Sequence, residues 1–184
     1  MELKKRKKAY GLADYILIAM MASLGIAVKS IIVPLTQIIT GPLFIPGGVG
    51  AGGIYMMFLV LGVSVTGKLG TATLIAAVQA VLVTVSGTMG SHGAVSLLTY
   101  TLPGLAVDGL YVLIRHRGCC APCCFAGGAL ANLVGSFAVN LAIFNLSLIP
   151  MLISMIAAAL SGGLGGIGAH MLAKNIRKLG ILNR

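Results

Sequence analysis

Long apolar segments, separated by short polar or glycine-rich turns, run along nearly all 184 residues of the chain. A membrane-spanning helix needs about 20 mostly apolar residues. The uncharged stretch 118–173 is long enough for two such helices, joined by a hairpin near 145–150. The pattern therefore predicts an all-α bundle of six transmembrane helices, with residues 1–184 forming one domain. The first four predicted spans cover roughly 12–32, 49–66, 70–89 and 96–114.

The basic residues indicate how these spans are oriented. Twelve of the 13 Lys and Arg residues fall where a single orientation of six spans places them on one side, and Lys29 is the exception. Lys and Arg are retained on the cytoplasmic side during insertion. We therefore expect a multi-pass protein of the cell membrane with both termini in the cytoplasm. Residues 1–11 then form a basic cytoplasmic N-terminus.

Composition and charge narrow the class of protein further. Charged residues make up only 9% of the chain, whereas a soluble domain carries about a quarter. The net charge of +10 is compatible with nucleic-acid binding, but the basic residues flank apolar segments and have no aromatic residues between them. Such charges are typical of topology signals and of contacts with anionic lipid. We expect the bilayer as a partner, and no nucleic acid.

The first two outer loops differ in character. The first, at 30–48, is long and apolar and contains Pro34, Pro42 and Pro46. Irregular backbone is not tolerated in lipid, so this loop should rest on protein or line a cavity. We predict a lid over a site open to the outside; the alternative is a re-entrant segment that only packs. The second outer loop contains His92, which is a candidate ligand contact or simply a solvated side chain.

Polar residues inside the predicted spans are costly and therefore informative. Counting along the spans places Gln79, Asp108 and Asn132 at similar depth. Ser136 and Asn140 follow Asn132 at four-residue intervals, which puts the three on one helix face. The alternative is that these groups only form hydrogen bonds between helices. Together they predict a polar-floored pocket that opens outward and suits a small ligand with several hydrogen-bonding groups.

Asp108 has further alternatives of its own. It shares a predicted helix face with Tyr100, but its carboxylate can also pair with Arg115, with Lys29 or with a backbone donor. A carboxylate at the pocket floor favours a cationic or amine-bearing ligand, because a buried charge needs a partner. The candidate substrate-binding residues are Gln79, His92, Tyr100, Asp108, Asn132, Ser136 and Asn140.

Small residues recur at four-residue spacing in the first and last predicted spans. Such spacing makes a flat helix face that another backbone can approach closely. Packing within the bundle is one interpretation, and docking of another membrane protein is the other. Because such faces occur on both terminal spans, we predict docking. The candidate partner-docking residues are Ala19, Ser23, Ala27, Gly162 and Gly166.

The four cysteines of the chain form one cluster at the inner end of the fifth predicted span. That end faces a reducing compartment, so we expect no disulfides. Thiol pairs can bind a soft metal, but the spacing lacks a second ligand pair. We therefore predict lipidated or inert thiols, with no metal and no cofactor. The cysteines are Cys119, Cys120, Cys123 and Cys124.

Two rival functions remain open at this point. A rhomboid-like intramembrane protease needs a serine nucleophile beside a histidine base, and Ser64 and His170 are the candidates. Val65 and Thr66, however, follow Ser64 where such a serine has a small residue. A stand-alone secondary transporter predicts inverted internal symmetry, which the sequence does not display. We therefore expect no catalytic residues.

Several short motifs resemble those of the S components of energy-coupling factor (ECF) transporters. The likeness covers nearly the whole chain and is nearest to the hydroxymethylpyrimidine/thiamine-type S components. This chain has Asp108 where that type has Glu, and Pro103 where it has Gln. The motifs are the basic N-terminus, Pro46-Gly47-Gly48, Gly52-Gly53-Ile54-Tyr55, the segment 104–111 followed by Arg115, and the glycine-rich segment 161–166 before a basic tail.

The resemblance implies a function and a set of partners. An S component binds a vitamin or related micronutrient from outside and delivers it through a transmembrane coupling (T) protein and two cytoplasmic ATPases. The family's small-residue motif in the first helix contacts the coupling protein, and it matches Ala19, Ser23 and Ala27 here. The chain contains no phosphate-binding loop of the Gly-x-x-x-x-Gly-Lys-Ser/Thr type, so the resemblance implies that ATP is hydrolysed by the partner subunits.

Overall fold

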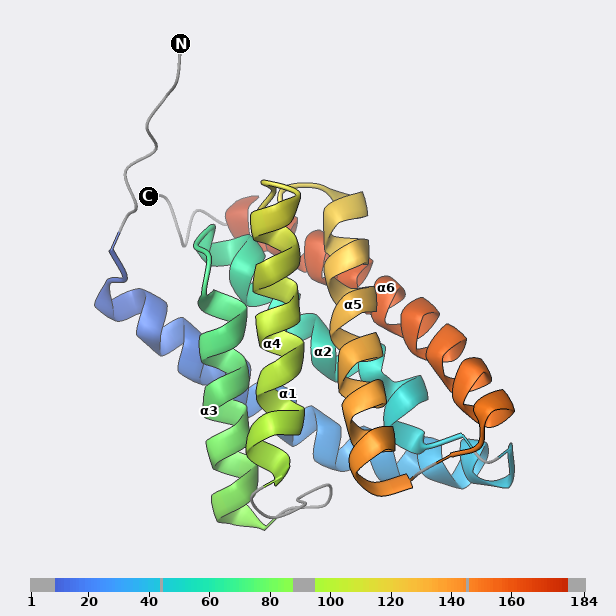
Figure 1. The fold of residues 1–184 in the computed structure, drawn as a ribbon. Helices are drawn as coiled ribbons and strands as arrows, with labels where there is room; N and C mark the ends of the chain where they lie inside the picture. The colour runs from blue at the N-terminus through green and yellow to red at the C-terminus, as the bar shows by residue number, and fades with distance from the viewer. Residues whose placement is uncertain (1–8, 44, 88–94, 145, 179–184) are drawn as a thin grey trace.

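Six α-helices make up the described part of the computed structural model, which covers residues 9–43, 45–87, 95–144 and 146–178 (Figure 1). No strand occurs within these ranges. Helices α3, α4 and α5 stand side by side, and α1 runs obliquely across the bundle. The elements are α1 Leu12–Thr40, the 3-10 turn η1 Gly41–Leu43, α2 Gly47–Thr66, α3 Thr71–Ser86, α4 Val95–Leu113, α5 Ala121–Val139, the π-helical turn η2 Asn140–Phe144 and α6 Leu148–Lys178.

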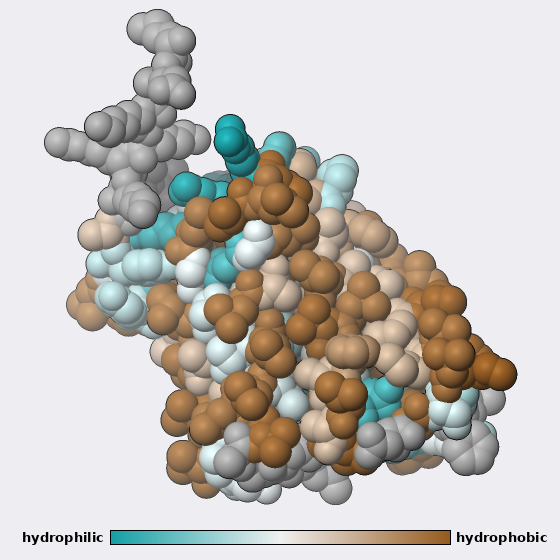
Figure 2. Space-filling model, in the orientation of Figure 1, coloured by the Kyte–Doolittle hydropathy of each residue, from teal (hydrophilic) through white to brown (hydrophobic). Residues whose placement is uncertain are grey.

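Helix lengths agree with a multi-pass membrane protein. Five of the described helices are long and apolar enough to cross a bilayer, and α3, with 16 residues, is a shorter apolar helix. Large aliphatic side chains lie exposed along these helices, and Figure 2 shows them as a broad hydrophobic surface with hydrophilic residues gathered at one end. An apolar surface of this extent is suited to lipid rather than to water. The predicted all-α membrane bundle is thereby confirmed in its helices.

The first helix corrects one expectation. Residues 30–40, predicted as part of an apolar loop, continue α1 as helix through Pro34. A proline inside a helix removes one backbone hydrogen bond, and membrane helices tolerate this loss where neighbouring groups take over. The Thr36 hydroxyl lies 2.9 Å from the carbonyl oxygens of both Val33 and Gly47, and so ties this half of α1 to the start of α2. The predicted lid segment is therefore mostly helical.

Glycines allow α2, α5 and α6 to pack with their backbones almost in contact. A methyl group at Gly165 would overlap the carbonyl oxygen of Gly53, and one at Gly162 would overlap that of Gly128. Gly166 is likewise closed off, by the carbonyl of Cys124. Gly162 and Gly166 are buried inside the bundle. That placement corrects their predicted docking role, because the four-residue spacing of small residues serves the protein's own helix packing here.

The two ends of the described chain lie at the same end of the bundle. Lys68, in the turn between α2 and α3, forms an ion pair with Asp14 at 2.5 Å and donates to the carbonyl of Ala9 at 2.7 Å. Arg177, near the end of α6, donates to the carbonyl of Ser64 at the end of α2. Both ends of the described chain are thus anchored at or just beyond the end of α2, as an even number of spans requires.

Candidate functional site

A cavity of about 160 Å³ lies between α1, α2, α3, α4 and α5, toward the end of the bundle opposite the chain ends. The start of α2 and the ends of α1 and α5 contribute to it. Because α2 has 20 residues, its two ends lie about 30 Å apart at 1.5 Å per residue. Sites for drug-sized ligands measure about 300–1,000 Å³. This cavity therefore suits a more compact molecule.

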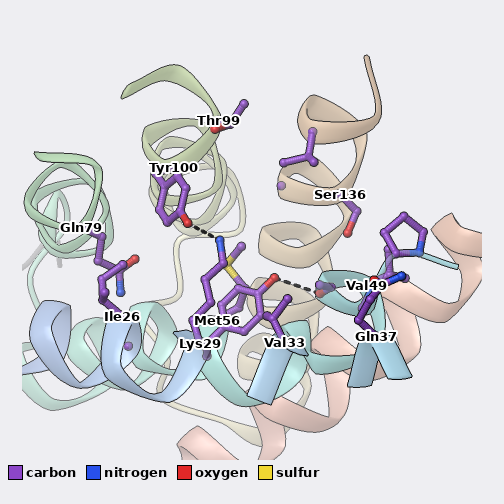
Figure 3. A pocket seen from close by; sticks show the side chains of 17 residues that line it. Ile26, Lys29, Val33, Gln37, Val49, Met56, Gln79, Thr99, Tyr100 and Ser136 are labelled. Carbon is purple, nitrogen blue, oxygen red and sulfur yellow. Dashed lines mark hydrogen bonds between the residues drawn. The ribbon is translucent and has the colours of Figure 1, made fainter. Parts of the chain in front are cut away.

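Lys29 is the central charged group of the cavity. Its ammonium group donates a hydrogen bond to the hydroxyl of Tyr100 (Figure 3). The same nitrogen lies 3.9 Å from the ring centre of Tyr100 and 5.3 Å from that of Tyr55. A cation over aromatic faces is attracted by the ring quadrupoles. The Tyr55 hydroxyl donates to the Gly48 carbonyl at 2.9 Å, which fixes the ring that faces Lys29.

Amide groups provide further polar contacts at the cavity wall. Gln79 of α3 lines the cavity, and its nitrogen lies 3.5 Å from the Ala22 carbonyl oxygen. A methyl group at Gly25 would overlap the Gln79 side chain, so the glycine makes room for it. Gln37 of α1 accepts a hydrogen bond from the backbone N–H of Gly47. The cavity thus presents an ammonium group, amides and hydroxyls from separate helices.

Three of the predicted binding residues meet at this cavity. Gln79, Tyr100 and Ser136 all line it, from α3, α4 and α5 respectively. Figure 3 shows them around Lys29 and Val33 of α1. His92 lies outside the described residues, so its predicted role stays a prediction. The remaining three, Asp108, Asn132 and Asn140, are not among the residues that line the cavity.

Asp108 holds two helices together instead. One of its carboxylate oxygens accepts hydrogen bonds from the backbone N–H and the hydroxyl of Thr73, both at 2.7 Å. Thr73 lies in the first turn of α3, where the backbone N–H groups have no partner within the helix. The negative charge also suits the positive end of the helix dipole. Of the alternatives that the sequence left open, the backbone donor is the one observed.

The two asparagines likewise make structural contacts. The Asn132 nitrogen donates to the carbonyls of Val49 at 3.0 Å and Ala158 at 2.9 Å, and so joins α5 to α2 and α6. The Asn140 oxygen accepts from the backbone N–H of Leu146 at 3.0 Å, which fixes the connection into α6. Buried polar groups need such partners. The hydrogen-bonding alternative therefore describes both residues.

Four polar residues of the cavity were not predicted from the sequence. Lys29 had been recognised as the exception to the charge pattern and as one alternative partner of Asp108, but not as a binding residue, although an ionisable residue inside a span is itself a signal for a functional site. Gln37 was not predicted as a binding residue because residues 30–48 had been assigned to a loop. Tyr55 and Thr99 are single polar residues in apolar helices, and nothing in the pattern distinguishes them. All four line the cavity.

The serine and histidine of the protease alternative do not form a dyad. The Ser64 hydroxyl has the Cys124 sulfur as its partner at 3.5 Å. Nδ1 of His170 lies 4.0 Å from the same sulfur. Among the described residues no hydrogen bond joins the Ser64 hydroxyl directly to the His170 ring, which a serine–histidine dyad requires. The predicted partner-docking residues of α1 lie on the surface of the bundle: Ala19, Ser23 and Ala27 are all exposed.

Comparisons with known proteins agree with a transport function. Residues 13–134 match the family model described as the permease component of ABC-type cobalt transport systems. Among curated proteins none matches the chain. A solved structure described as an S component of an ECF transporter is similar, with a TM-score of 0.77 and 17% sequence identity over 95% of this chain and 89% of that one. At this identity the likeness establishes the fold. The chain therefore belongs to the family of permease components of ABC-type cobalt transport systems, and its helices adopt the fold of an ECF-transporter S component.

Proposed function

We propose that this protein is the substrate-binding subunit of an ECF-type ABC importer. It captures a vitamin or related micronutrient from outside and hands it to a transmembrane coupling protein and two cytoplasmic ATPases. The observation that carries this proposal is the cavity around Lys29, walled by five helices and lined by amides and hydroxyls. The cavity belongs to a chain whose family is a transport family.

The charges support an orientation in which the cavity opens outward. The end of the bundle that holds the chain ends also carries the basic residues Lys68, Arg115, Arg117 and Arg177. Arg117 donates there to the Gly67 carbonyl at 3.2 Å. Retention of basic residues on the inside makes this end cytoplasmic. The cavity then faces the exterior. Reporter fusions at the C-terminus test this: a cytoplasmic reporter should be active, and an active exported reporter contradicts the orientation.

The lining favours an organic ligand with an electron-rich acceptor group. With Asp108 engaged elsewhere, the described lining contains no carboxylate, so the reason for expecting a cationic ligand disappears. The Lys29 ammonium group can donate a hydrogen bond to a carboxylate, a phosphate or a ring heteroatom of the ligand. The lining residues described also include no thiol or imidazole, and cobalt-type cations prefer such ligands. We therefore propose a compact micronutrient rather than the metal ion in the family's description.

Ligand capture and uptake are tested separately. Native mass spectrometry of the full chain purified in detergent should reveal a bound organic molecule, which should rebind without ATP. In liposomes the protein alone should bind this molecule but not accumulate it. Accumulation should require co-reconstitution with a coupling protein, both ATPases and ATP. Accumulation by the chain alone would contradict the proposal in favour of a secondary transporter, and absence of any small-molecule binding would remove its basis.

A further inference from the structure

Four potential metal ligands gather at the end of the bundle away from the cavity. They are contributed by the turn between α4 and α5 and by the first turn of α5. Nδ1 or Nε2 of the histidine and the three sulfur atoms all lie within 4.8 Å of one another. The residues are His116, Cys119, Cys120 and Cys123.

The separations are close to those of a tetrahedral site. Nδ1 of His116 lies 3.1 Å from the Cys119 sulfur and 3.9 Å from the Cys120 sulfur. The Cys120 and Cys123 sulfur atoms are 2.8 Å apart. Zinc bonds of about 2.3 Å to sulfur and about 2.0–2.1 Å to nitrogen place tetrahedral ligand atoms roughly 3.5–3.8 Å from one another. Adjustments of about 1 Å or less would bring these three of the six ligand pairs to tetrahedral separations, and the other three pairs also lie within 4.8 Å.

The local backbone explains why these side chains converge. Arg115 and Gly118 both have left-handed backbone conformations, with φ of 56° and 65°, and these reverse the chain after α4. Gly118 packs against Ser64 so closely that a methyl group there would overlap the serine hydroxyl. The turn therefore has one tightly defined path. That path carries His116 back over the cysteines that follow it.

The beginning of α5 then directs two of the sulfur atoms. Cys120 is the N-cap residue, and its backbone N–H donates to the Cys123 sulfur at 3.1 Å. Anionic ligands at this position are favoured by the positive end of the helix dipole. Three thiolates around a divalent cation leave one net negative charge, and two basic residues, Arg115 and Arg117, lie within a few residues of the ligands in the sequence. Backbone donation to a ligand sulfur is the kind of supporting contact that orients ligands in metal sites.

We propose that His116, Cys119, Cys120 and Cys123 form a Cys3His site for a thiophilic, tetrahedrally coordinated cation of the zinc type. The sequence spacing had argued against a metal because it lacked a second ligand pair. The structure adds His116, from the α4–α5 turn, to three of the four cysteines. The site lies at the opposite end of α5 from the cavity, so it is separate from the proposed substrate site. A bound ion cross-links the turn to the first turn of α5.

Metal analysis of the full-length protein tests the site directly. The protein is purified in detergent with a reductant present and with an affinity tag that contains no histidine, then equilibrated with Zn²⁺ and desalted. Elemental analysis should find one zinc ion per chain. Co²⁺ in place of Zn²⁺ should produce thiolate-to-cobalt charge-transfer absorption and the intense visible bands of tetrahedral cobalt. Zn²⁺ should also raise the midpoint of thermal unfolding.

Matched variants identify the ligands. His116 and Cys119 are exposed, so His116→Ala and Cys119→Ser should keep the fold while losing stoichiometric zinc and the zinc-dependent rise in melting temperature. Cys124 is the one cysteine outside the cluster, and Cys124→Ser should retain both. Gel filtration and circular dichroism check that each variant is folded. The proposal is overturned if the wild type retains no zinc, if either ligand variant binds like the wild type, or if a folded Cys124→Ser loses the metal.

Discussion

The ammonium group of Lys29 donates a hydrogen bond to the hydroxyl of Tyr100 and lies 3.9 Å from the centre of the same ring. The two residues come from α1 and α4, so this pair joins two walls of the cavity. Their contact holds the positive charge inside the cavity instead of allowing it to reach the membrane surface, as lysines near helix ends commonly do. A charge held in this way is suited to receiving a ligand.

Removing this charge should weaken ligand binding without unfolding the protein. Lys29→Met keeps most of the apolar stem and removes the ammonium group. A hydrogen bond to a charged group contributes about 1.5–3 kcal/mol, which corresponds to a loss of about tenfold to a hundredfold in affinity. Isothermal titration with the co-purified ligand measures it. Lys174→Met, an exposed position on α6, is the control and should bind normally. Equal affinity in Lys29→Met would contradict the proposed ligand contact.

Asp108 should matter for stability and not for binding. Asp108→Ala removes the acceptor for the Thr73 N–H and hydroxyl. An unsatisfied buried donor costs about 1–3 kcal/mol, so the free energy of unfolding should fall by this amount. Unfolding in a detergent mixture measures the loss. Thr73→Val keeps the backbone contact and should cost less. A variant that is as stable as the wild type but binds the ligand poorly would return Asp108 to the binding site.

Two glycines of α6, one turn apart, should respond in opposite directions to the same change. Gly165→Ala places a methyl group against the Gly53 carbonyl, and overpacking of this kind costs about 1–3 kcal/mol. Gly168→Ala meets no atom within 4 Å and should stabilise the helix by roughly 0.5–1 kcal/mol, because alanine loses less backbone entropy than glycine. Melting temperatures of the two variants measure the difference. Similar melting temperatures would contradict the close α2–α6 approach.

The exposed small residues on α1 should govern assembly with the proposed coupling protein. Ser23→Leu enlarges the middle of the face formed with Ala19 and Ala27, and a bulky side chain prevents close backbone approach. Co-purification of coupling protein and ATPases with the variant should fall sharply, while ligand binding by the isolated subunit stays normal. Gly109→Leu, at an exposed position of α4 with open space around it, should assemble like the wild type. Normal assembly of Ser23→Leu would assign α1 no docking role.

The membrane fold could be predicted well because lipid imposes a length and a polarity on each span. Six helices, their approximate limits and the hairpin before α6 all follow from apolar runs of about 20 residues. The error in α1 has an equally physical cause. In soluble proteins a proline usually ends a helix. Here α1 continues beyond Pro34, because Thr36 and the neighbouring α2 stabilise this part of the helix. Sequence rules for proline do not include that neighbour.

The candidate site was predicted less completely because sequence spacing gives depth and helix face but not the partner opposite. Gln79 and Asn132 were assigned similar depth, yet one lines the cavity and the other bonds to two carbonyls between α2 and α6. The same limit applies to the cysteines, because the turn at Gly118 decides that the His116 ring meets three of them.

By itself, the sequence determined that this chain spans the membrane several times as a helical bundle, because the cost of burying polar backbone in lipid leaves an apolar chain almost no other structure. Tertiary structure alone decided which polar side chains serve the cavity and which serve the framework. Hydrogen bonding in a low-dielectric interior pairs each buried group with whatever partner packing brings within about 3 Å, and that partner usually lies on a different helix.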